Sequence, residues 1–244
     1  MKEGQGLIYG RNPVTEAIAS GAGIEKILIQ RNIEGAGKKI FSLAKKAGIA
    51  VQGVDKAALD RITGGVSHQG VAAYVSGFEY SDIESMLYLA ESRGEKPFIA
   101  VLDGIEDPHN LGAIIRSAEG AGIHGVVIHK SRAVSMTPAA VKASAGASAH
   151  MKVARVANIK AALNTLQGKG LWVYGLDMGG KPYKEVDYTG GTALVVGSEG
   201  SGMSRLVKET CDVLVSIPMK GKVGSLNASN AAAIVFFEAA STRG

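Results

Sequence analysis

The stretch FIAVLDGIEDPHNLGAIIRSAEGAGIHGVVIH, residues 98–129, decides the fold because in it two apolar strands flank one helix. Residues 98–104 and 125–129 are short, mainly apolar runs, as expected for strands buried on both faces. Between them, the apolar residues at 111, 114, 115 and 118 form one face of a helix. Because parallel strands need a crossover connection, this stretch predicts one unit of a parallel sheet with helices packed on it.

The same alternation of strand and helix continues through residues 97–244, which we take as one domain. Further strands are expected at 152–156, 171–178, 192–198 and 213–219. Helices are expected at 137–148, 159–170 and 204–210, with a last helix from Leu226. The sequence therefore predicts fold class α/β, with a parallel sheet covered by helices on both faces.

A smaller α/β domain is expected over residues 1–77. Asn12 and Pro13 fit the cap and the first position of a helix, and strand and helix signals alternate after them. The polar, acidic residues 78–96 hold one short helix and are expected to link the two domains. The helix expected at 38–48 carries lysines at positions that place several on one side, which is typical of a solvated face or of an RNA-binding patch. These are Lys38, Lys39, Lys45 and Lys46.

Composition and charge fit a protein with a sizeable core. The 244 residues are 46% hydrophobic and 20% charged, and the net charge of +5 favours a polyanionic partner without establishing one. The single cysteine, Cys211, excludes an intrachain disulfide and a cysteine-based zinc site, and we expect it to be a buried, inert thiol. We find no run of signal-peptide or membrane-spanning length, so we predict a cytoplasmic protein without a membrane partner.

The first of three polar loops follows the strand at 98–104. Ligands of open α/β sheets bind outside the carboxyl ends of the strands, so such loops are candidate sites. Asn110 fits a helix N-cap, and Arg116 lies off the apolar face of the helix. Gly112 and Gly120 flank Arg116 at i−4 and i+4, which would let another backbone or a ligand come close. The alternative is a surface arginine paired with Glu119.

The other two loops also follow apolar strands. In ALVVGSEGSGMS, residues 193–204, the glycine order differs from the dinucleotide-binding fingerprint, and Glu199 is the one carboxylate. In IPMKGKVGSLNASNAAAI, residues 217–234, Ser225 fits an N-cap, and Asn227, Ser229 and Asn230 follow beside the free amides of the first turn. A tight turn and an ordinary capped helix are the alternatives, but the helix alone leaves the additional polar side chains unexplained.

Together, the segments at 102–122, 194–204 and 217–234 resemble the SpoU/TrmH family of SPOUT RNA 2′-O-ribose methyltransferases in type, order and spacing. RAVSMTPAAVKASAGA between them is similar to the same family. In the smaller domain, YGRNPVTEAI and HQGVAAYV look like the family's substrate-binding domain. The combination is most similar to the bacterial enzymes that methylate a guanosine in 23S rRNA. The resemblance implies a deep trefoil knot, S-adenosylmethionine as methyl donor, no metal, an RNA partner and a homodimer.

The resemblance also implies which residues act. The catalytic residues would be Asn110, Arg116, Glu199, Ser225 and Asn227. The donor would be bound by Gly197, Gly200, Ile217, Met219, Ser225 and Leu226. Asn230 departs from the family pattern, since a small apolar residue such as valine is expected there.

The proposed chemistry needs the ribose hydroxyl to be positioned and to lose its proton. An arginine pKa above about 12 makes Arg116 a poor general base, so we expect it to bind the adjacent phosphate and polarise the hydroxyl. His109 is the alternative base. The smaller domain would locate a loop or unstacked bases of the RNA, with Arg11, His68 and Gln69 as candidate contacts.

Three alternative functions remain open. The same chemistry could act on tRNA or could confer antibiotic resistance by modifying rRNA. The same fold could serve a non-catalytic RNA-binding protein of ribosome assembly, although the complete set of motif residues speaks against it. An unrelated nucleotide-binding enzyme is disfavoured because the dinucleotide and P-loop patterns are missing.

Overall fold

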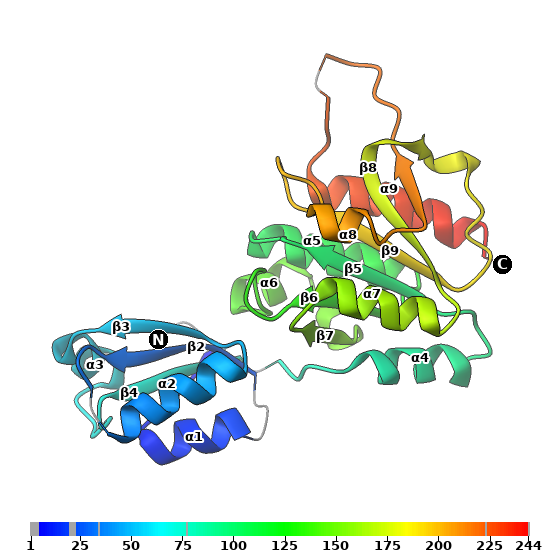
Figure 1. Cartoon of the computed structure of the whole chain (residues 1–244). Helices are drawn as coiled ribbons and strands as arrows, with labels where there is room; N and C mark the ends of the chain where they lie inside the picture. Colours follow the sequence, from blue (N-terminus) through cyan, green and yellow to red (C-terminus); the bar gives the residue numbers. More distant parts are fainter. Residues whose placement is uncertain (1–4, 20–22, 34, 77, 223, 244) are drawn as a thin grey trace. The chain divides into compact units, whose positions relative to one another are not determined.

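The computed structural model describes residues 5–19, 23–33, 35–76, 78–222 and 224–243 (Figure 1). The chain divides into two compact units, one of residues 1–79 with 136–138 and one of residues 80–135 with 139–244. The expected domain boundary at Gly77 lies outside the described residues. No helix in the described part of the chain is long and apolar enough to cross a membrane.

The first unit is a four-stranded sheet in the order β1-β4-β2-β3. Its strands are β1 (Gln5–Tyr9), β2 (Ile24–Gln30), β3 (Ala50–Val54) and β4 (Val71–Ser76), and its helices are α1 (Arg11–Ala19), α2 (Ala36–Lys46) and α3 (Lys56–Thr63). Alternate residues of β2 face opposite sides of the sheet. Ile27 therefore packs with α1 and α2, whereas Leu28 packs with Leu59 of α3.

Two details of this unit differ from the sequence analysis. Strand β1 was not expected, because its five residues carry only a short apolar run; it pairs antiparallel with β4. Helix α1 begins at Arg11, so Asn12 lies inside the helix and is not its cap. The second difference lies at a helix end, where assignments commonly vary by one or two residues.

The second unit contains a six-stranded, all-parallel sheet in the order β10-β8-β9-β5-β6-β7. Its strands are β5 (Phe98–Asp103), β6 (Gly125–His129), β7 (Val153–Val156), β8 (Trp172–Pro182), β9 (Thr192–Gly197) and β10 (Val213–Ser216). Strands β6 and β9 are buried along their whole length, which explains their continuous apolar sequences. The predicted α/β fold with a parallel sheet is confirmed.

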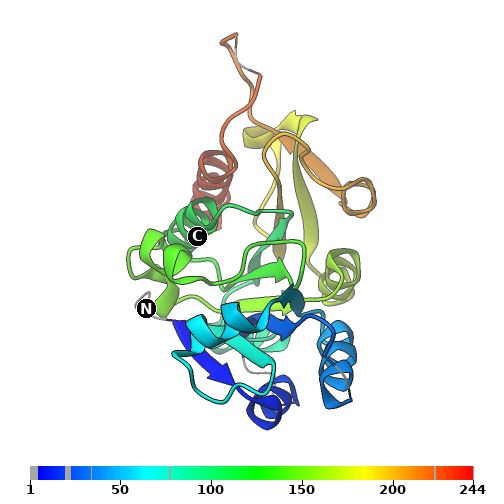
Figure 2. The ribbon, with the colours of Figure 1, turned by 90° about the vertical axis from the view of Figure 1, so that its left-hand side faces the viewer.

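Helices cover both faces of this sheet. One face is covered by α4 (Ile83–Ser92), α7 (Ile159–Gly168) and α8 (Arg205–Lys208), which share one apolar core with the strands. The other carries α5 (Pro108–Gly120) and α9 (Ala228–Ser241), which pack on each other; Figure 2 shows them in green and red, opposite the yellow-green α7. The short helix α6 (Pro138–Ala143) and the turns η1 (Ala147–Ala149) and η2 (Tyr183–Glu185) complete the unit.

Helix α4 falls within residues 78–96, which the sequence suggested as a connector with one short helix. Its Met86 is fully buried in the core of the second unit. A Cβ atom on Gly125 of β6 would lie only 2.3 Å from the Met86 sulfur, so this glycine lets α4 approach the sheet. The helical part of the segment therefore belongs structurally to the second unit.

Strands β5 and β9 are neighbours whose connections leave in opposite directions. The chain runs from β5 through α5 to β6, and from β9 through α8 to β10 at the other edge. Such a switch point opens a crevice at the carboxyl ends of the strands. The loops after Asp103 and Gly197, which carry two of the three candidate motifs, border this crevice.

Candidate active site

Asn110 is not the cap of helix α5, contrary to the sequence analysis. The cap is Asp107, whose carboxylate accepts a hydrogen bond from the backbone N–H of His109 at 2.9 Å, and Pro108 takes the first helical position. Asn110 lies in the first turn instead and is only 9% exposed. Its amide is therefore free for contacts outside its own helix.

Asn227, not Ser225, caps helix α9. Its side-chain oxygen accepts from the backbone N–H groups of Ser229 at 2.9 Å and Asn230 at 3.4 Å. Ser225 is exposed and precedes the cap by two residues. Ser225 and Asn227 are both residue types that cap helices well, and Asn227 occupies the cap position.

Three motif residues meet at the switch point. Because the Asn227 oxygen is occupied by its helix, its Nδ2 group is the donor: it bonds Asn110 Oδ1 at 3.0 Å and Glu199 Oε1. Glu199 Oε1 also accepts from the backbone N–H of Ala228 at 3.4 Å. Hydrogen bonds thus join residues 117 positions apart in the chain. The Asn110 Nδ2 group has no hydrogen-bond acceptor among the described residues.

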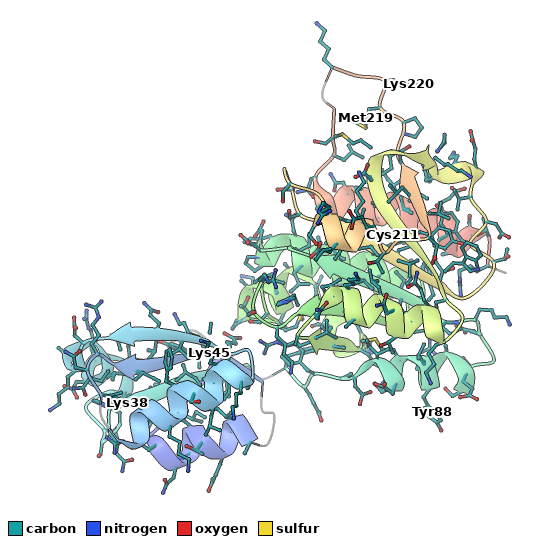
Figure 3. All side chains as sticks on the ribbon, in the orientation of Figure 1. Lys38, Lys45, Tyr88, Cys211, Met219 and Lys220 are labelled. Atoms are coloured by element: carbon teal, nitrogen blue, oxygen red, sulfur yellow. The ribbon has the colours of Figure 1, made fainter. Side chains whose placement is uncertain are left out.

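A cavity of about 460 Å³, here called the donor cavity, lies beside this cluster. An adjoining pocket of about 120 Å³ shares part of its lining. The larger one is lined by the predicted donor residues Gly197, Gly200, Ser225 and Leu226, and the smaller by Ile217, Met219, Ser225 and Leu226. Figure 3 shows Met219 and Lys220 on the loop between β10 and α9. All six predicted donor residues therefore line adjoining hollows.

Two features of the donor cavity were not anticipated. Leu176, Asp177 and Met178, at the bend of β8, line both hollows. The signal that could have found them is their place near the end of an apolar strand in a parallel sheet. Lys208 bonds the Asp177 carboxylate at 2.8 Å and, with that hydrogen bond as the largest cause, lowers its pKa.

Gly197 is required by the backbone of the same cavity. A Cβ atom there would lie 2.3 Å from the carbonyl carbon of Gly202, because the loop after β9 folds back on the strand end. The loop is closed by paired backbone hydrogen bonds between Ser198 and Gly202, at 3.1 and 3.0 Å. It presents Glu199 at its tip to Asn227.

A smaller hollow of about 310 Å³, here called the reaction cavity, lies on the α5 side of the cluster. It is lined by Asn110, Glu199, Glu106, Asp107 and the loop residues Gly104, Ile105, Ser198 and Ser201. Ser198, Glu199 and Ser201 also line the donor cavity. The two cavities therefore meet at the hydrogen-bonded cluster, as a two-substrate transfer requires.

Arg116 stands apart from this cluster. It lies six residues beyond Asn110 on α5, which is about 9 Å along the helix and about 240° around it. Its side chain is exposed, lines neither cavity, and forms no ion pair with Glu119 or any other described residue. Within one chain, the structure therefore brings together every predicted catalytic residue except Arg116, with Ser225 lining the donor cavity.

The glycines beside Arg116 are used by the chain's own helices. A Cβ atom on Gly112 would lie 2.5 Å from the Ala140 carbonyl oxygen, so Gly112 admits the backbone of α6. A Cβ atom on Gly120 would lie 3.4 Å from the Phe237 ring of α9. The expected close approach of another backbone is thus made by α6 at Gly112, and no space for a ligand is needed to explain this glycine.

Cys211 is half-buried, and burial raises the pKa of its thiol to about 12. Its Sγ group donates to the Val207 carbonyl at 3.3 Å. A thiol with this pKa stays protonated at neutral pH and is a poor nucleophile, as the sequence analysis expected. Within the described ranges, no group of three or more histidine, cysteine or carboxylate side chains could hold a metal ion.

The candidate RNA contacts lie together in the first unit, around a hollow of about 780 Å³. The Arg11 Nε group donates to the Gln69 carbonyl at 3.2 Å, and the Arg11 backbone N–H donates to the Gln69 side chain at 3.1 Å. His68 is only 4% exposed, with Nδ1 accepting from Gly70 and Nε2 lying 2.9 Å from Asp60. Both ring nitrogens of His68 are therefore engaged within the protein.

The fold and the paired cavities define a doubly wound α/β protein whose site lies at the carboxyl ends of its strands. A model of the SpoU rRNA methylase family matches residues 97–237, and one for RNA 2′-O ribose methyltransferase substrate binding matches residues 7–81. The chain is 43% identical to YacO of Bacillus subtilis (strain 168), which is assigned to the TrmH family of tRNA/rRNA methyltransferases. The match covers 98% of this chain and 96% of that protein.

Solved structures of SpoU and TrmH proteins have a similar fold. The SpoU methyltransferase AviRb of Streptomyces viridochromogenes, in complex with AdoMet, has a TM-score of 0.62 and 25% identity, covering 98% of this chain and 90% of that one. The TrmH/SpoU tRNA modifying enzyme of A. aeolicus has a TM-score of 0.55 and 27% identity over 65% of this chain and 83% of that one. The chain belongs to the SpoU/TrmH family of S-adenosylmethionine-dependent RNA methyltransferases, and the predicted resemblance is confirmed.

Proposed function

We propose that this protein transfers a methyl group from S-adenosylmethionine to the ribose 2′-hydroxyl of one nucleotide in RNA, with a guanosine of 23S rRNA as the favoured target. The observation that carries this proposal is the cluster of Asn110, Glu199 and Asn227 at the meeting point of two cavities. One cavity suits the donor and the other a ribose.

The donor cavity has the chemistry that S-adenosylmethionine requires. Leu176, Leu226 and Met178 supply apolar surface for an adenine ring, and the Asp177 carboxylate can accept hydrogen bonds from hydroxyl or ammonium groups. The glycine loop at 197–202 lets backbone groups approach closely. When bound, the sulfonium supplies the methyl group and leaves as a neutral thioether.

The chain's own residues would orient the hydroxyl. The Asn110 Nδ2 group can donate to the 2′-oxygen, while Asn227 holds the Asn110 amide in the required orientation. The 2′-oxygen forms a bond to the methyl carbon as the carbon–sulfur bond breaks, and the hydroxyl proton passes to solvent. Arg116 would bind the neighbouring phosphate and make the proton easier to lose.

Arg116 can serve this role if it comes from a second subunit, so we propose a homodimer. On α9, Phe237 is 52% exposed and lies beside Gly120 of α5, and Ile234 of the same helix is 36% exposed. An exposed apolar surface next to Arg116 favours pairing through these helices. The arginine of one subunit would then face the reaction cavity of the other.

Methyl transfer to RNA tests the proposal. Tritiated S-adenosylmethionine is incubated with the protein and with total RNA from a strain lacking its gene. We expect label in 23S rRNA, no turnover by Arg116→Ala, and donor binding by that variant in calorimetry close to wild type. Near-normal turnover by Arg116→Ala would remove its assignment, and absence of label from all RNA would remove the proposed activity.

A tRNA target is the second candidate, because the relatives are assigned to tRNA or rRNA and a tRNA modifying enzyme is among the similar structures. Separating the labelled RNA by size distinguishes the two. A non-catalytic RNA-binding role would leave both fractions unlabelled. The trefoil knot and the cytoplasmic location stay predictions; the abundance of RNA and methyl donor in the cytoplasm supports the latter.

A further inference from the structure

A third cavity, of about 630 Å³, lies at the carboxyl ends of β5, β6 and β7 and is here called the flanking cavity. It shares Gly104, Glu106, Ser198 and Ser201 with the reaction cavity. In the strand order β10-β8-β9-β5-β6-β7, β8 and β9 are followed by β5 and then by β6 and β7. The donor, reaction and flanking cavities therefore follow one another along the same edge of the sheet.

The charges of the flanking cavity are divided between its two ends. Asp103 and Glu106 belong to the end of β5, next to the reaction cavity. Arg132 follows β6, and Lys160 lies in the first turn of α7, which follows β7. A ligand that fits this pattern has hydrogen-bond donors near β5 and a negative charge near β6 and β7.

The loop that carries Arg132 is held in place by His129. Its Nδ1 atom accepts from the backbone N–H groups of both Ser131 and Arg132, each at 3.0 Å. Burial, as the largest cause, lowers the pKa of His129, so the ring stays neutral and keeps this acceptor at neutral pH. The Arg155 guanidinium donates to the Lys130 carbonyl at 2.7 Å and also holds this loop.

Both cations are available to a ligand. Arg132 and Lys160 are exposed, and neither forms an ion pair with a described residue. At the start of α7 the Asn158 side chain caps one backbone amide, that of Ala161, at 3.1 Å. The other first-turn amides add to the positive potential beside Lys160.

We propose that the flanking cavity binds the nucleotide next to the methylated ribose, with its phosphate held by Arg132 and Lys160. Donor groups of its base or ribose would bond Asp103 and Glu106; Asp103 already accepts from the Ser204 backbone N–H at 2.7 Å through one oxygen. The proposal rests on the proposed function, because it requires a ribose in the reaction cavity. Adjacent nucleotides of one strand then occupy adjacent cavities.

The test compares two lysines at opposite ends of α7. Lys160 lines the cavity, whereas Lys169, also exposed and just after the end of α7, does not. Lys160→Ala and Lys169→Ala change the net charge equally. We measure RNA binding by filter retention between 50 and about 200 mM salt, with ribosomal RNA from a strain lacking the gene as probe. Arg132→Ala and Lys160→Arg complete the set, and the donor Kd comes from calorimetry.

We expect Lys160→Ala and Arg132→Ala each to weaken RNA binding about tenfold, with donor Kd unchanged. Each should flatten the slope of log K against log salt by about 0.7, the contribution of one phosphate contact on a single strand. Lys160→Arg should restore the slope, and Lys169→Ala should match wild type. A salt slope for Lys160→Ala equal to that of Lys169→Ala would overturn the proposal.

The binding assay keeps this result separate from the proposed activity. If wild-type protein binds RNA but transfers no methyl group, the proposed function fails, and the salt slopes still decide whether Arg132 and Lys160 contact phosphate. If free phosphate competes with RNA in wild type and in Lys160→Ala alike, the cavity holds no RNA phosphate and the proposal fails. Loss of binding in Lys169→Ala as well would indicate a general charge effect and would also overturn it.

Discussion

The two polar clusters of this protein differ in how their hydrogen bonds are used. In the second unit, Asn110, Glu199 and Asn227 come from three distant segments, bond one another, and leave groups facing cavities. In the first unit, Arg11 and Gln69 bond each other, and His68 is buried with both ring nitrogens engaged. Side chains that bond across segments and keep free groups can act on a ligand, whereas a buried side chain such as His68, with both ring nitrogens engaged, mainly holds the shape of its unit.

Asn110→Asp is expected to have the largest effect on activity. The variant keeps the oxygen that accepts from Asn227 but loses the Nδ2 donor and adds a charge near Glu199. Removing one donor to a developing oxyanion costs about 10²–10³ in kcat. We expect a loss of that size in single-turnover methyl transfer, with donor Kd within about threefold.

His109→Ala is the control for that variant. His109 is the neighbour of Asn110, and its exposed side chain lies outside the hydrogen-bonded cluster. A wild-type rate in His109→Ala would exclude it as the base. If this variant lost as much activity as Asn110→Asp, the histidine would be the acting group and the role given to Asn110 would be wrong.

Asn227 caps helix α9 through its side-chain oxygen and bonds Asn110 through its Nδ2 group. Two substitutions separate these contacts. Asn227→Ser retains a good cap but loses the Nδ2 link to Asn110, so kcat should fall about tenfold with little change in unfolding free energy. Asn227→Ala loses the cap as well and should cost about 1 kcal/mol in urea unfolding. Equal unfolding free energies of the two variants, or a wild-type kcat in Asn227→Ser, would contradict this division.

In the first unit, His68→Ala should act on stability. It leaves the Gly70 backbone N–H without its acceptor in a buried site, which costs about 1–3 kcal/mol. We expect a higher KM for RNA through distortion of the hollow, with kcat unchanged. The exposed neighbour Gln69 is the matched control: Gln69→Ala should weaken RNA binding with a smaller loss of stability than His68→Ala. If His68→Ala weakened RNA binding more and lost less stability than Gln69→Ala, His68 itself would contact RNA.

The smallest effect concerns acid sensitivity at His124. Its Nδ1 accepts from the Phe98 backbone N–H at 3.0 Å and its Nε2 bonds Glu95; burial, as the largest cause, lowers its pKa. Below about pH 6.5, the ordinary histidine pKa, the unfolded chain therefore binds more protons than the folded chain. The free energy of unfolding thus falls as the pH decreases from there. Urea unfolding at pH 7.5 and 5.5 should show a smaller decrease in unfolding free energy for His124→Asn than for wild type. An equal decrease would mean that other groups cause the acid sensitivity.

Much of the second unit follows from its sequence, because buried parallel strands read as continuous apolar runs and their loops collect glycine and polar residues. The caps of α5 and α9 were misplaced because Asp107 and Asn110, and likewise Ser225 and Asn227, are all suitable cap residues a few positions apart. Leu176, Asp177 and Met178 lie near the end of an apolar strand, but the strand order that brings this end beside β9 does not follow from that pattern. The six-residue spacing separates Arg116 from Asn110 around α5, but only the packing of α5 decides that Asn110 is the one that lines the reaction cavity.

Alkaline hydrolysis of the labelled RNA decides whether the methyl group is on the ribose, since a 2′-O-methyl group prevents cleavage of the adjacent phosphodiester. Ribosomal RNA carrying tritiated methyl groups, made by wild-type protein, is hydrolysed and separated by size. The account predicts that the label is recovered in alkali-resistant dinucleotides, and that Asn110→Asp leaves them unlabelled. Label in mononucleotides alone would place the methyl group on a base and contradict transfer to the ribose.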